Sequence, residues 1–441
     1  ISAHPIKEYD QPSENKTGKK LVIYPNVEFQ EITGIGGAFN EIGGLALMSL
    51  PKESREDIMA NIFSKDGAQF SFCRTAIGSS DFGANAYSYA EIADDYQMNH
   101  FSIKREKKSV IPYIKMALEY NPNMTLFASP WSPPGWMKYS GLMDQGVKTP
   151  EKNKLKDEPK IYEAYALYLA NYVKAYAKED ITVDKILIQN ETDIHTKYPS
   201  CVMPNNQMYK FVTDYLRPQF EKDKIKTKIW AGTFRTSGAL DAIEFVSNEK
   251  YLNSVDGIGI QYTKTNYISD MNLLAKGKPT MHTEGNCYNG QNTTHQAFKR
   301  LKEVASYINY GIPNYCYWNM ILDETGKSGW GWKQNSLINI DSKTQEVIYN
   351  PDYSVIALFS KYMQPGAKRI ASYAKETLIS LKKDNKIYLF VQNKSDKEKK
   401  YRCVEKGETV ATATIPAKSV AVIIYNTNML KSRENKKRVE K

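Results

Sequence analysis

Two glutamates follow apolar segments that have the pattern of buried β-strands. Glu191 comes after the segment Lys185–Gln189 and Asn190, and Glu284 comes directly after Pro279–Thr283. In a parallel barrel the reacting groups lie where the strands end, so both carboxyl groups are expected at one mouth. A protonated and an ionised carboxyl group about 5–5.5 Å apart support a two-step displacement at an anomeric carbon.

A single glutamate at the end of a strand is more often an ordinary loop carboxylate than a catalytic one. Here both glutamates follow candidate strands, the fourth and the seventh in chain order, and this coincidence favours the catalytic interpretation. Asn190 directly precedes Glu191. An amide at that position can donate to a sugar 2-hydroxyl, an interaction that strengthens in an oxocarbenium-like transition state.

The segments between about residues 30 and 370 predict the elements that hold these groups. Short β-branched or aromatic runs alternate with longer helical stretches, as expected for repeated βα units and a parallel sheet. The strand candidates are Thr33–Phe39, Phe70–Ile77, Met124–Ser129, Lys185–Gln189, Lys228–Gly232, Gly257–Tyr262, Pro279–Thr283 and Tyr315–Met320. We therefore predict an α/β fold in which eight such units close into a (β/α)8 TIM barrel.

Helical segments are predicted between these strands, at Pro51–Phe63, Val110–Tyr120, Ile161–Ala177, Asn206–Phe220, Leu240–Ser247 and His295–Tyr310. The alternative to a barrel is an open doubly wound sheet. Such a sheet would be expected to carry a GxGxxG or GxxxxGK phosphate loop, and the sequence contains neither.

A second, smaller domain is predicted after residue 370, where short alternating stretches are separated by Asn, Asp, Gly and Lys turns. This pattern is typical of a small side β-sandwich, and the apolar segment Lys20–Val27 has the same pattern. We expect residues 1–30 to contribute a strand to the sandwich, 31–370 to form the catalytic barrel, 371–426 to complete the sandwich and 427–441 to be a charged tail.

The net charge of +11 is spread along the chain among acidic residues, which argues against nucleic-acid binding. The 5 cysteines lie at wide, irregular spacing and the 5 histidines form no close pair, so we expect no metal and no cofactor. No apolar run approaches the roughly 20 residues of a membrane span. We expect a monomer that binds a carbohydrate, without membrane insertion, in a secreted, periplasmic or cell-surface location.

Several stretches resemble glycoside hydrolase family 30, which includes glucosylceramidases and endo-β-1,6-glucanases. The matching stretches are Gly34–Gly44, Cys73–Tyr89, Ala128–Lys138 (ASPWSPPGWMK), Gln189–Glu191, Thr283–Asn286, Tyr317–Leu322 and Phe359–Arg369. They cover most of the predicted barrel in the order of the family, and ASPWSPPGWMK is highly specific. The resemblance implies a retaining enzyme with a barrel and a side β-sandwich.

The resemblance also implies roles for individual residues. Glu191 matches the acid/base and Glu284 the nucleophile of the family. Residues matching those that line the glycone site are Asp81, Trp131, Asn190 and Trp318, with Arg74 beneath the nucleophile and Tyr262 in the loop that shapes the pocket beside it. From the residues alone, Asp81 could bind two vicinal hydroxyls or form an Asx-turn, the tryptophans could stack on a sugar or pack in the core, and Arg74 could be a structural ion-pair partner.

Two positions depart from the family pattern. Thr192 follows Glu191 where the family usually has Pro, and the sixth strand ends in Gln261-Tyr262-Thr263 where glucosylceramidase relatives carry a His and two aromatics. The leading hypothesis is hydrolysis of β-linked glucosyl residues, in a β-1,6-glucan or a β-glucoside, by double displacement. The alternatives are a β-xylosidase or xylanase, a β-fucosidase, a glucosylceramidase, or an inactive carbohydrate-binding protein.

Overall fold

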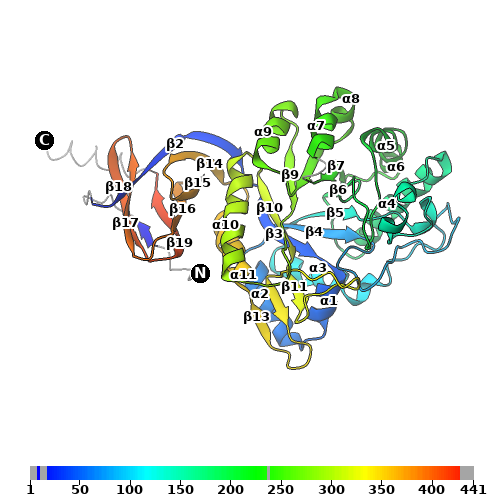
Figure 1. Cartoon of the computed structure of the whole chain (residues 1–441), viewed down its shortest axis with the longest axis horizontal. Coiled ribbons are helices and arrows are strands. Elements are labelled where there is room, and N and C mark those ends of the chain that lie inside the picture. The colour runs from blue at the N-terminus through cyan, green and yellow to red at the C-terminus, as the bar shows by residue number, and fades with distance from the viewer. Residues whose placement is uncertain (1–6, 10–16, 236–238, 428–441) are drawn as a thin grey trace.

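The larger part of the computed structural model is a barrel of eight parallel strands surrounded by helices (Figure 1). The structure describes residues 7–9, 17–235 and 239–427. In chain order the barrel strands are β3 (Gly34–Phe39), β4 (Phe72–Ile77), β5 (Thr125–Pro130), β6 (Lys185–Leu187), β7 (Lys228–Phe234), β8 (Gly257–Gln261), β9 (Thr280–Glu284) and β10 (Asn314–Asn319). The predicted fold class, an α/β TIM barrel with a small side β domain, is confirmed; the side domain, predicted as a β-sandwich, is a single mixed sheet in the described residues.

Neighbouring barrel strands pair in chain order, and β10 returns to pair with β3. The last gap closes where β9 and β10 lie side by side, with the Gly285 amide donating to the Cys316 carbonyl at 2.7 Å. Several strands, such as β4 and β9, are buried along their whole length because helices cover one face and the barrel core the other. Arg74 in β4 and Glu284 in β9 are therefore charged groups inside a buried layer.

Helices connect the barrel strands on the outside. They are α1 (Glu41–Met48), α2 (Lys52–Phe63), α3 (Val110–Tyr120), α4 (Pro159–Ala177), α5 (Asn205–Phe211), α6 (Arg217–Lys222), α7 (Ala239–Ser247), α8 (Glu249–Ser254), α9 (Thr265–Leu274), α10 (Thr294–Asn309) and α11 (Pro351–Tyr362). The single helix predicted at 206–220 is instead α5, a π-helical turn at Val212–Leu216, and α6. Pro218, near the start of α6, lacks the amide hydrogen that a continuous α-helix would use.

The side domain is a mixed eight-stranded sheet in the order β1-β19-β16-β15-β14-β2-β17-β18. Its strands are β1 (Lys7–Tyr9), β2 (Lys19–Glu31), β14 (Lys368–Tyr373), β15 (Thr377–Lys383), β16 (Lys386–Asn393), β17 (Lys399–Glu405), β18 (Glu408–Ile415) and β19 (Ser419–Asn426). The sheet curls so that β18 contacts β19 around its own apolar core. A third, three-stranded sheet joins β11 (Ile321–Asp323), β12 (Ile338–Ile340) and β13 (Val347–Tyr349) beyond the barrel.

Successive side chains of β16 belong to the cores of two different domains, and this explains how the domains are joined. Leu389 and Val391 point into the side-domain core, whereas Phe390 belongs to the core of the barrel. The Phe390 ring lies 5.0 Å from that of Phe359 on α11, measured between centroids. Helix α10 lies between the barrel and the side domain in Figure 1, and its Asn309 side chain donates to the Leu378 carbonyl at 2.8 Å. The two domains therefore share an apolar interface with at least one hydrogen bond across it.

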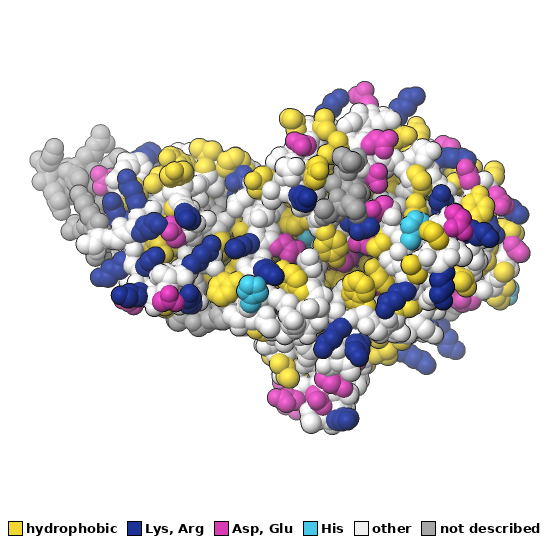
Figure 2. Space-filling view, viewed as in Figure 1, with side chains coloured by type: hydrophobic (Ala, Val, Ile, Leu, Met, Phe, Trp, Pro, Cys, Tyr) yellow, Lys and Arg dark blue, Asp and Glu magenta, His cyan; other side chains and the backbone are white. Residues whose placement is uncertain are grey.

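The domain limits remain predictions, but the strands nearest to them are now known. Strand β2 runs on to Glu31, and β14 begins at Lys368. Most of the charged tail predicted at 427–441 lies outside the described residues. Figure 2 shows Lys and Arg side chains spread over both domains of the visible face, with acidic side chains among them. Among the described residues, no helix is long and apolar enough to cross a membrane.

Candidate active site

The strand ends of the barrel bring the predicted site residues together. Asp81 comes from the loop after β4, Trp131 directly follows β5, and Asn190 and Glu191 follow β6. Tyr262 follows β8, Glu284 ends β9, and Trp318 lies in β10. Because the carboxyl ends of parallel barrel strands meet at one mouth, these side chains from six strands converge there.

Arg74 is the centre of this group, although none of its side chain is exposed. Its guanidinium donates to Oε2 of Glu284 at 2.8 Å, to Oδ1 of Asn190 at 2.7 Å and to Oγ of Ser129 at 2.6 Å. The guanidinium carbon also lies 4.5 Å from the centroid of the Trp131 ring. One buried cation therefore fixes side chains from three other strands.

Glu284 is surrounded by groups that favour its ionised form. Burial raises the pKa of its carboxyl group above the ordinary value, while the positive charge of Arg74 and hydrogen bonds from Tyr262 and Arg74 act in the opposite direction and limit the rise. The Tyr262 hydroxyl donates to Oε1, so both carboxylate oxygens have a donor. Of the two glutamates, Glu284 is the one with a directly paired cation.

Glu191 forms no ion pair with another described residue, and Arg235 acts on it only as a more distant charge. Burial and the negative charge of Glu284 raise the pKa of its carboxyl group to about 7. Its backbone is in the left-handed region, with φ 48°, and its amide donates to Oγ1 of Thr233 at 3.1 Å. A non-glycine residue in this region is strained, and the surrounding structure must hold it there. The carboxyl groups are thus separated in proton affinity, Glu191 being the group that keeps its proton up to near-neutral pH.

Gln261 joins the surroundings of the two glutamates. Its Nε2 donates to Oε1 of Glu191 at 3.3 Å, and its Oε1 accepts from the Thr283 hydroxyl at 2.8 Å. Gln261 is fully buried at the end of β8. This residue, one of the two departures from the family pattern, therefore holds the Glu191 side chain relative to the strand that carries Glu284.

Asp81 lies beside a stacked pair of tryptophans, of which Trp131 lines the same cavity as Asp81 and Trp318 lies behind Trp131. The Trp131 and Trp318 rings are stacked with centroids 4.9 Å apart, and Nε1 of Trp318 donates to Oδ2 of Asp81 at 3.3 Å. The other oxygen of Asp81 is buried and accepts no hydrogen bond from the described residues. Burial and the charges of Glu284 and Glu191 raise the pKa of Asp81 well above its ordinary value. The free oxygen is the group best placed to accept from a ligand hydroxyl.

A cavity of about 260 Å³ contains six of the predicted residues: Asp81, Trp131, Asn190, Glu191, Tyr262 and Glu284. Arg74 and Trp318 are fully buried and do not line the cavity. The rest of the lining consists of Ile194, Tyr198, Arg235, Asn286, Cys287, Tyr288, Trp332 and Gln334. Among the described residues there is no cluster of three or more side chains that could hold a metal ion.

Sequence reasoning missed the residues that support the site from behind. Ser129 receives two donors from Arg74, and Thr233 contacts both the Glu191 amide and the Asn190 side chain. Each is a polar residue near the end of a buried strand, which is the signal that could have identified it. The residues on long loops, such as Tyr198 and Trp332, carry no comparable signal.

The geometry defines the class of the protein. Two buried carboxyl groups of different proton affinity, with an asparagine and a tryptophan beside them at the mouth of a (β/α)8 barrel, are the arrangement of a glycoside hydrolase. The family model described as Glycosyl hydrolase family 30 TIM-barrel domain matches residues 32–238. Over residues 32–238 the chain matches glycoside hydrolase family 30, and it is a glycoside hydrolase of the retaining kind.

Relatives of known name fall into two groups. A Caenorhabditis elegans protein classed as an unconfirmed glucosylceramidase is 28% identical over 373 residues, covering 79% of this chain and 70% of the relative. The lysosomal acid glucosylceramidase of Mus musculus is 24% identical over 426 residues, covering 88% and 80%. The endo-1,6-β-D-glucanase of Neurospora crassa is 28% identical over 232 residues, covering 52% and 47%.

Two solved structures share the fold along nearly the whole chain. SrfJ from Salmonella typhimurium superposes with a TM-score of 0.85 at 23% identity, covering 95% of this chain and 94% of that one. The endo-β1,6-glucanase BT3312 superposes with a TM-score of 0.82 at 22% identity, covering 92% and 94%. The arrangement of barrel and side domain is therefore a shared one.

A second buried carboxyl group supports the loop that carries Asp81. Glu106, in the 3₁₀ turn Glu106–Lys108, accepts from the hydroxyls of Tyr87 at 2.8 Å, Tyr89 at 2.7 Å and Tyr176 at 2.6 Å. The Tyr89 oxygen in turn accepts from the Gly78 amide at 2.7 Å, at the start of the Asp81 loop. Glu106 thereby anchors the loop to α4, which carries Tyr176.

We predict that Glu106 makes folding stability depend on pH. Burial raises its pKa from 4.5 to about 7, so the folded protein holds a proton that the unfolded chain releases in this interval. The free energy of unfolding should then fall as the pH rises from 4.5 to about 7. When the free energy of unfolding is measured with urea across this pH range, it should fall less steeply with pH for Glu106→Gln than for the native protein. The exposed Glu163→Gln is the control, and an unchanged slope in Glu106→Gln would contradict the prediction.

Proposed function

We propose that this enzyme cleaves β-linked glucosyl residues by double displacement, with Glu284 as nucleophile and Glu191 as acid/base. The observation that carries the proposal is the asymmetry of the pair. Arg74 and Tyr262 donate to Glu284, which favours a carboxylate, whereas burial and the Glu284 charge raise the pKa of Glu191 to about 7. A nucleophile must be ionised and an acid must be protonated, so these surroundings support the two assignments.

In the first step a carboxylate oxygen of Glu284 attacks the anomeric carbon. The glycosidic bond breaks, and Glu191 gives its proton to the departing oxygen. The product is a glycosyl ester on Glu284, which no longer carries a negative charge. Since that charge is one cause of the raised pKa of Glu191, the pKa falls once the ester has formed, and Glu191 becomes a base.

In the second step the ionised Glu191 takes a proton from a water molecule as the water oxygen attacks the anomeric carbon. The ester bond to Glu284 breaks, the sugar leaves with its original configuration, and Glu191 is protonated again. Asn190, held by Arg74 and Thr233, is placed to bind the sugar 2-hydroxyl in both steps. The change in the Glu284 charge therefore switches Glu191 between its two roles.

The substrate assignment rests on Asp81, on the cavity and on the relatives. The unpaired oxygen of Asp81 suits the hydroxyls of a glucose-like ring. The cavity of about 260 Å³ is slightly below the range of roughly 300–1,000 Å³ common for drug-sized ligands, and so favours a single sugar ring. The relatives named as endo-1,6-β-D-glucanase and glucosylceramidase support a glucosyl unit in β-linkage. We propose a β-1,6-glucan or a β-glucoside as the substrate.

Glucosylceramide is the second candidate, favoured by the names of the two glucosylceramidase relatives. The sequence Gln261-Tyr262-Thr263 stands where such relatives usually carry a His and two aromatics, and this difference beside Glu284 argues against glucosylceramide. We further propose that the enzyme acts as a monomer outside the cytoplasm, where polysaccharide is found. The name of the lysosomal mouse relative supports a location of that kind.

The substrate proposal predicts a ranking of activities. Release of reducing sugar should be fastest from β-1,6-glucan, lower from an aryl β-glucoside, and negligible from xylan or an aryl β-fucoside. The measurement is the initial rate for each substrate at equal mass concentration. Activity confined to xylan would overturn the glucosyl assignment, and hydrolysis of glucosylceramide faster than of the glucan would favour the second candidate.

The nucleophile assignment predicts the effect of Glu284→Gln. Turnover should fall by at least about 10³-fold because an amide cannot form the glycosyl ester, while the ligand still binds. Initial rates and calorimetric binding of the glucan fragments measure the two effects separately. Glu405→Gln, which replaces a buried glutamate of the side domain, should keep the native rate. A native rate in Glu284→Gln would exclude Glu284 as the nucleophile.

The acid assignment predicts the alkaline limit of activity. Because Glu191 must be protonated before the glycosidic bond breaks, kcat/KM should fall as the pH rises through about 7. The pH profile of kcat/KM on an unactivated glucan fragment measures this limit. A 2,4-dinitrophenyl β-glucoside needs no proton at its leaving oxygen. Its rate of hydrolysis should therefore fall much less in Glu191→Gln than the rate for the unactivated glucan fragment. A profile that stays flat well above pH 7 would contradict the assignment.

A further inference from the structure

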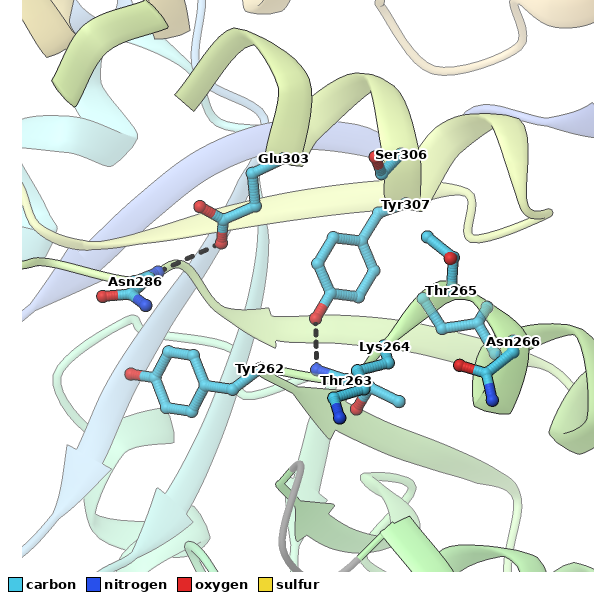
Figure 3. A pocket seen from close by; sticks show the side chains of 10 residues that line it. Tyr262, Thr263, Lys264, Thr265, Asn266, Asn286, Glu303, Ser306 and Tyr307 are labelled. Atoms are coloured by element: carbon cyan, nitrogen blue, oxygen red, sulfur yellow. Dashed lines mark hydrogen bonds between the residues drawn. The ribbon is translucent and has the colours of Figure 1, made fainter. Parts of the chain in front are cut away.

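A second cavity, of about 600 Å³, adjoins the one that contains the two glutamates. Tyr262 and Asn286 line both cavities, so the two spaces are neighbours. The second cavity lies between the loops after β8 and β9, the start of α9 and the side of α10. Figure 3 shows its lining residues, which come from these four parts of the chain.

The inner wall of the second cavity is held by hydrogen bonds. The Tyr307 hydroxyl on α10 accepts from the Thr263 amide at 2.8 Å, and Oε1 of Glu303 accepts from the Asn286 amide at 3.1 Å (Figure 3). Glu303 is itself fixed by Arg300, which donates to it at 2.7 Å. Both loops are therefore tied to one helix, and the cavity exists before any ligand enters.

The outer wall has polar groups that are not used by the fold. The side chains of Lys264, Thr265, Asn266 and Ser306 line the cavity and make no hydrogen bond to another described residue. Ile268 is the one aliphatic side chain among the ten lining residues, and Tyr262 and Tyr307 are the aromatic ones. Hydroxyl, amide and ammonium groups beside aromatic rings match the surface of a sugar and do not match an alkyl chain.

The second cavity has one positively charged group and one carboxyl group, on different walls. Lys264 is a cation on the outer wall, and Glu303 is a carboxyl group on the inner wall that is already paired with Arg300. A strongly anionic ligand would meet the Glu303 carboxyl group, and a cationic one would meet the Lys264 ammonium group. A neutral ligand rich in hydroxyl groups meets neither obstacle.

We propose that the second cavity binds a further neutral sugar unit of the chain whose glucosyl residue occupies the catalytic cavity. This inference rests on the proposed function and names the substrate class as an oligosaccharide or polysaccharide. Tyr262 connects the two sites, since it donates to Glu284 and also lines the second cavity. The second sugar unit therefore binds next to the residue that holds the nucleophile.

The test compares chain-length dependence in full-length variants. Binding of methyl β-glucoside and of β-1,6-linked glucose oligomers of two to four units is measured by calorimetry in a Glu284→Gln background, which prevents turnover. One variant adds Lys264→Ala and Asn266→Ala, which removes two groups on the exposed rim. A second variant adds Ser306→Tyr, which fills the cavity from α10. Asp270→Ala, an exposed change on α9 outside the lining, is the matched control.

We expect Kd to tighten with chain length in the background protein and in the control. The double truncation should reduce that gain about tenfold, as expected for two lost hydrogen bonds, and Ser306→Tyr should remove it. The affinity for methyl β-glucoside sets the baseline within each variant. An equal chain-length gain in all variants, or no gain in the background protein, overturns the inference.

The same measurements separate this inference from the proposed function. Turnover of an aryl β-glucoside by the native chain tests the reaction alone, since that substrate has no second sugar unit. Turnover together with an unchanged chain-length gain in the variants means that the second cavity is not a sugar site. If the cavity variants show a smaller gain in affinity with chain length, but the native chain turns over no β-glucoside, the cavity assignment is supported and the proposed reaction is overturned.

Discussion

The structure depends on one buried positive charge, the guanidinium of Arg74. Withdrawing such a group from water costs several kcal/mol unless anions and acceptors surround it. Glu284, Asn190 and Ser129 supply those partners from three different strands, and Trp131 covers one face. Glu284 is therefore at once the counter-ion of the barrel interior and the candidate nucleophile. The requirement to neutralise Arg74 favours the ionised form of this carboxyl group against the effect of burial and fixes the position of its Oε2, so folding itself orients the candidate nucleophile.

Three carboxyl groups share the candidate catalytic cavity, and among the described residues Glu284 is the one that forms an ion pair, with Arg74. Burial raises the pKa of Asp81, Glu191 and Glu284, and for Glu284 the charge and hydrogen bond of Arg74 and the hydrogen bond of Tyr262 act against this rise. Like charges in a water-poor space cannot all be ionised near neutral pH. The proton therefore stays on the groups farther from Arg74, which is the state an acid catalyst requires. Separate roles for two chemically identical side chains follow from the placing of one arginine.

Much of this could be predicted from the sequence. The barrel strands are apolar runs with a regular spacing, and the glutamates directly follow two of them, so both the fold class and the convergence of Glu191 with Glu284 were accessible. The position of Trp318 was not: it lies behind Trp131 and holds Asp81. Whether a strand-end tryptophan faces a cavity or the layer beneath it depends on packing between neighbouring strands. The second cavity was equally out of reach, since its shape depends on two loops and the face of α10.

The unpaired oxygen of Asp81 links substrate binding to protonation. In the empty cavity burial and the two neighbouring glutamates favour the protonated acid. A sugar hydroxyl that donates to Oδ1 stabilises the ionised form, as the Trp318 indole already does at Oδ2. Binding therefore favours loss of a proton from Asp81, and the new negative charge strengthens the hold of Glu191 on its own proton. Under the proposed mechanism, a glycone that makes this contact would therefore help to keep Glu191 protonated, which is the form that an acid catalyst requires.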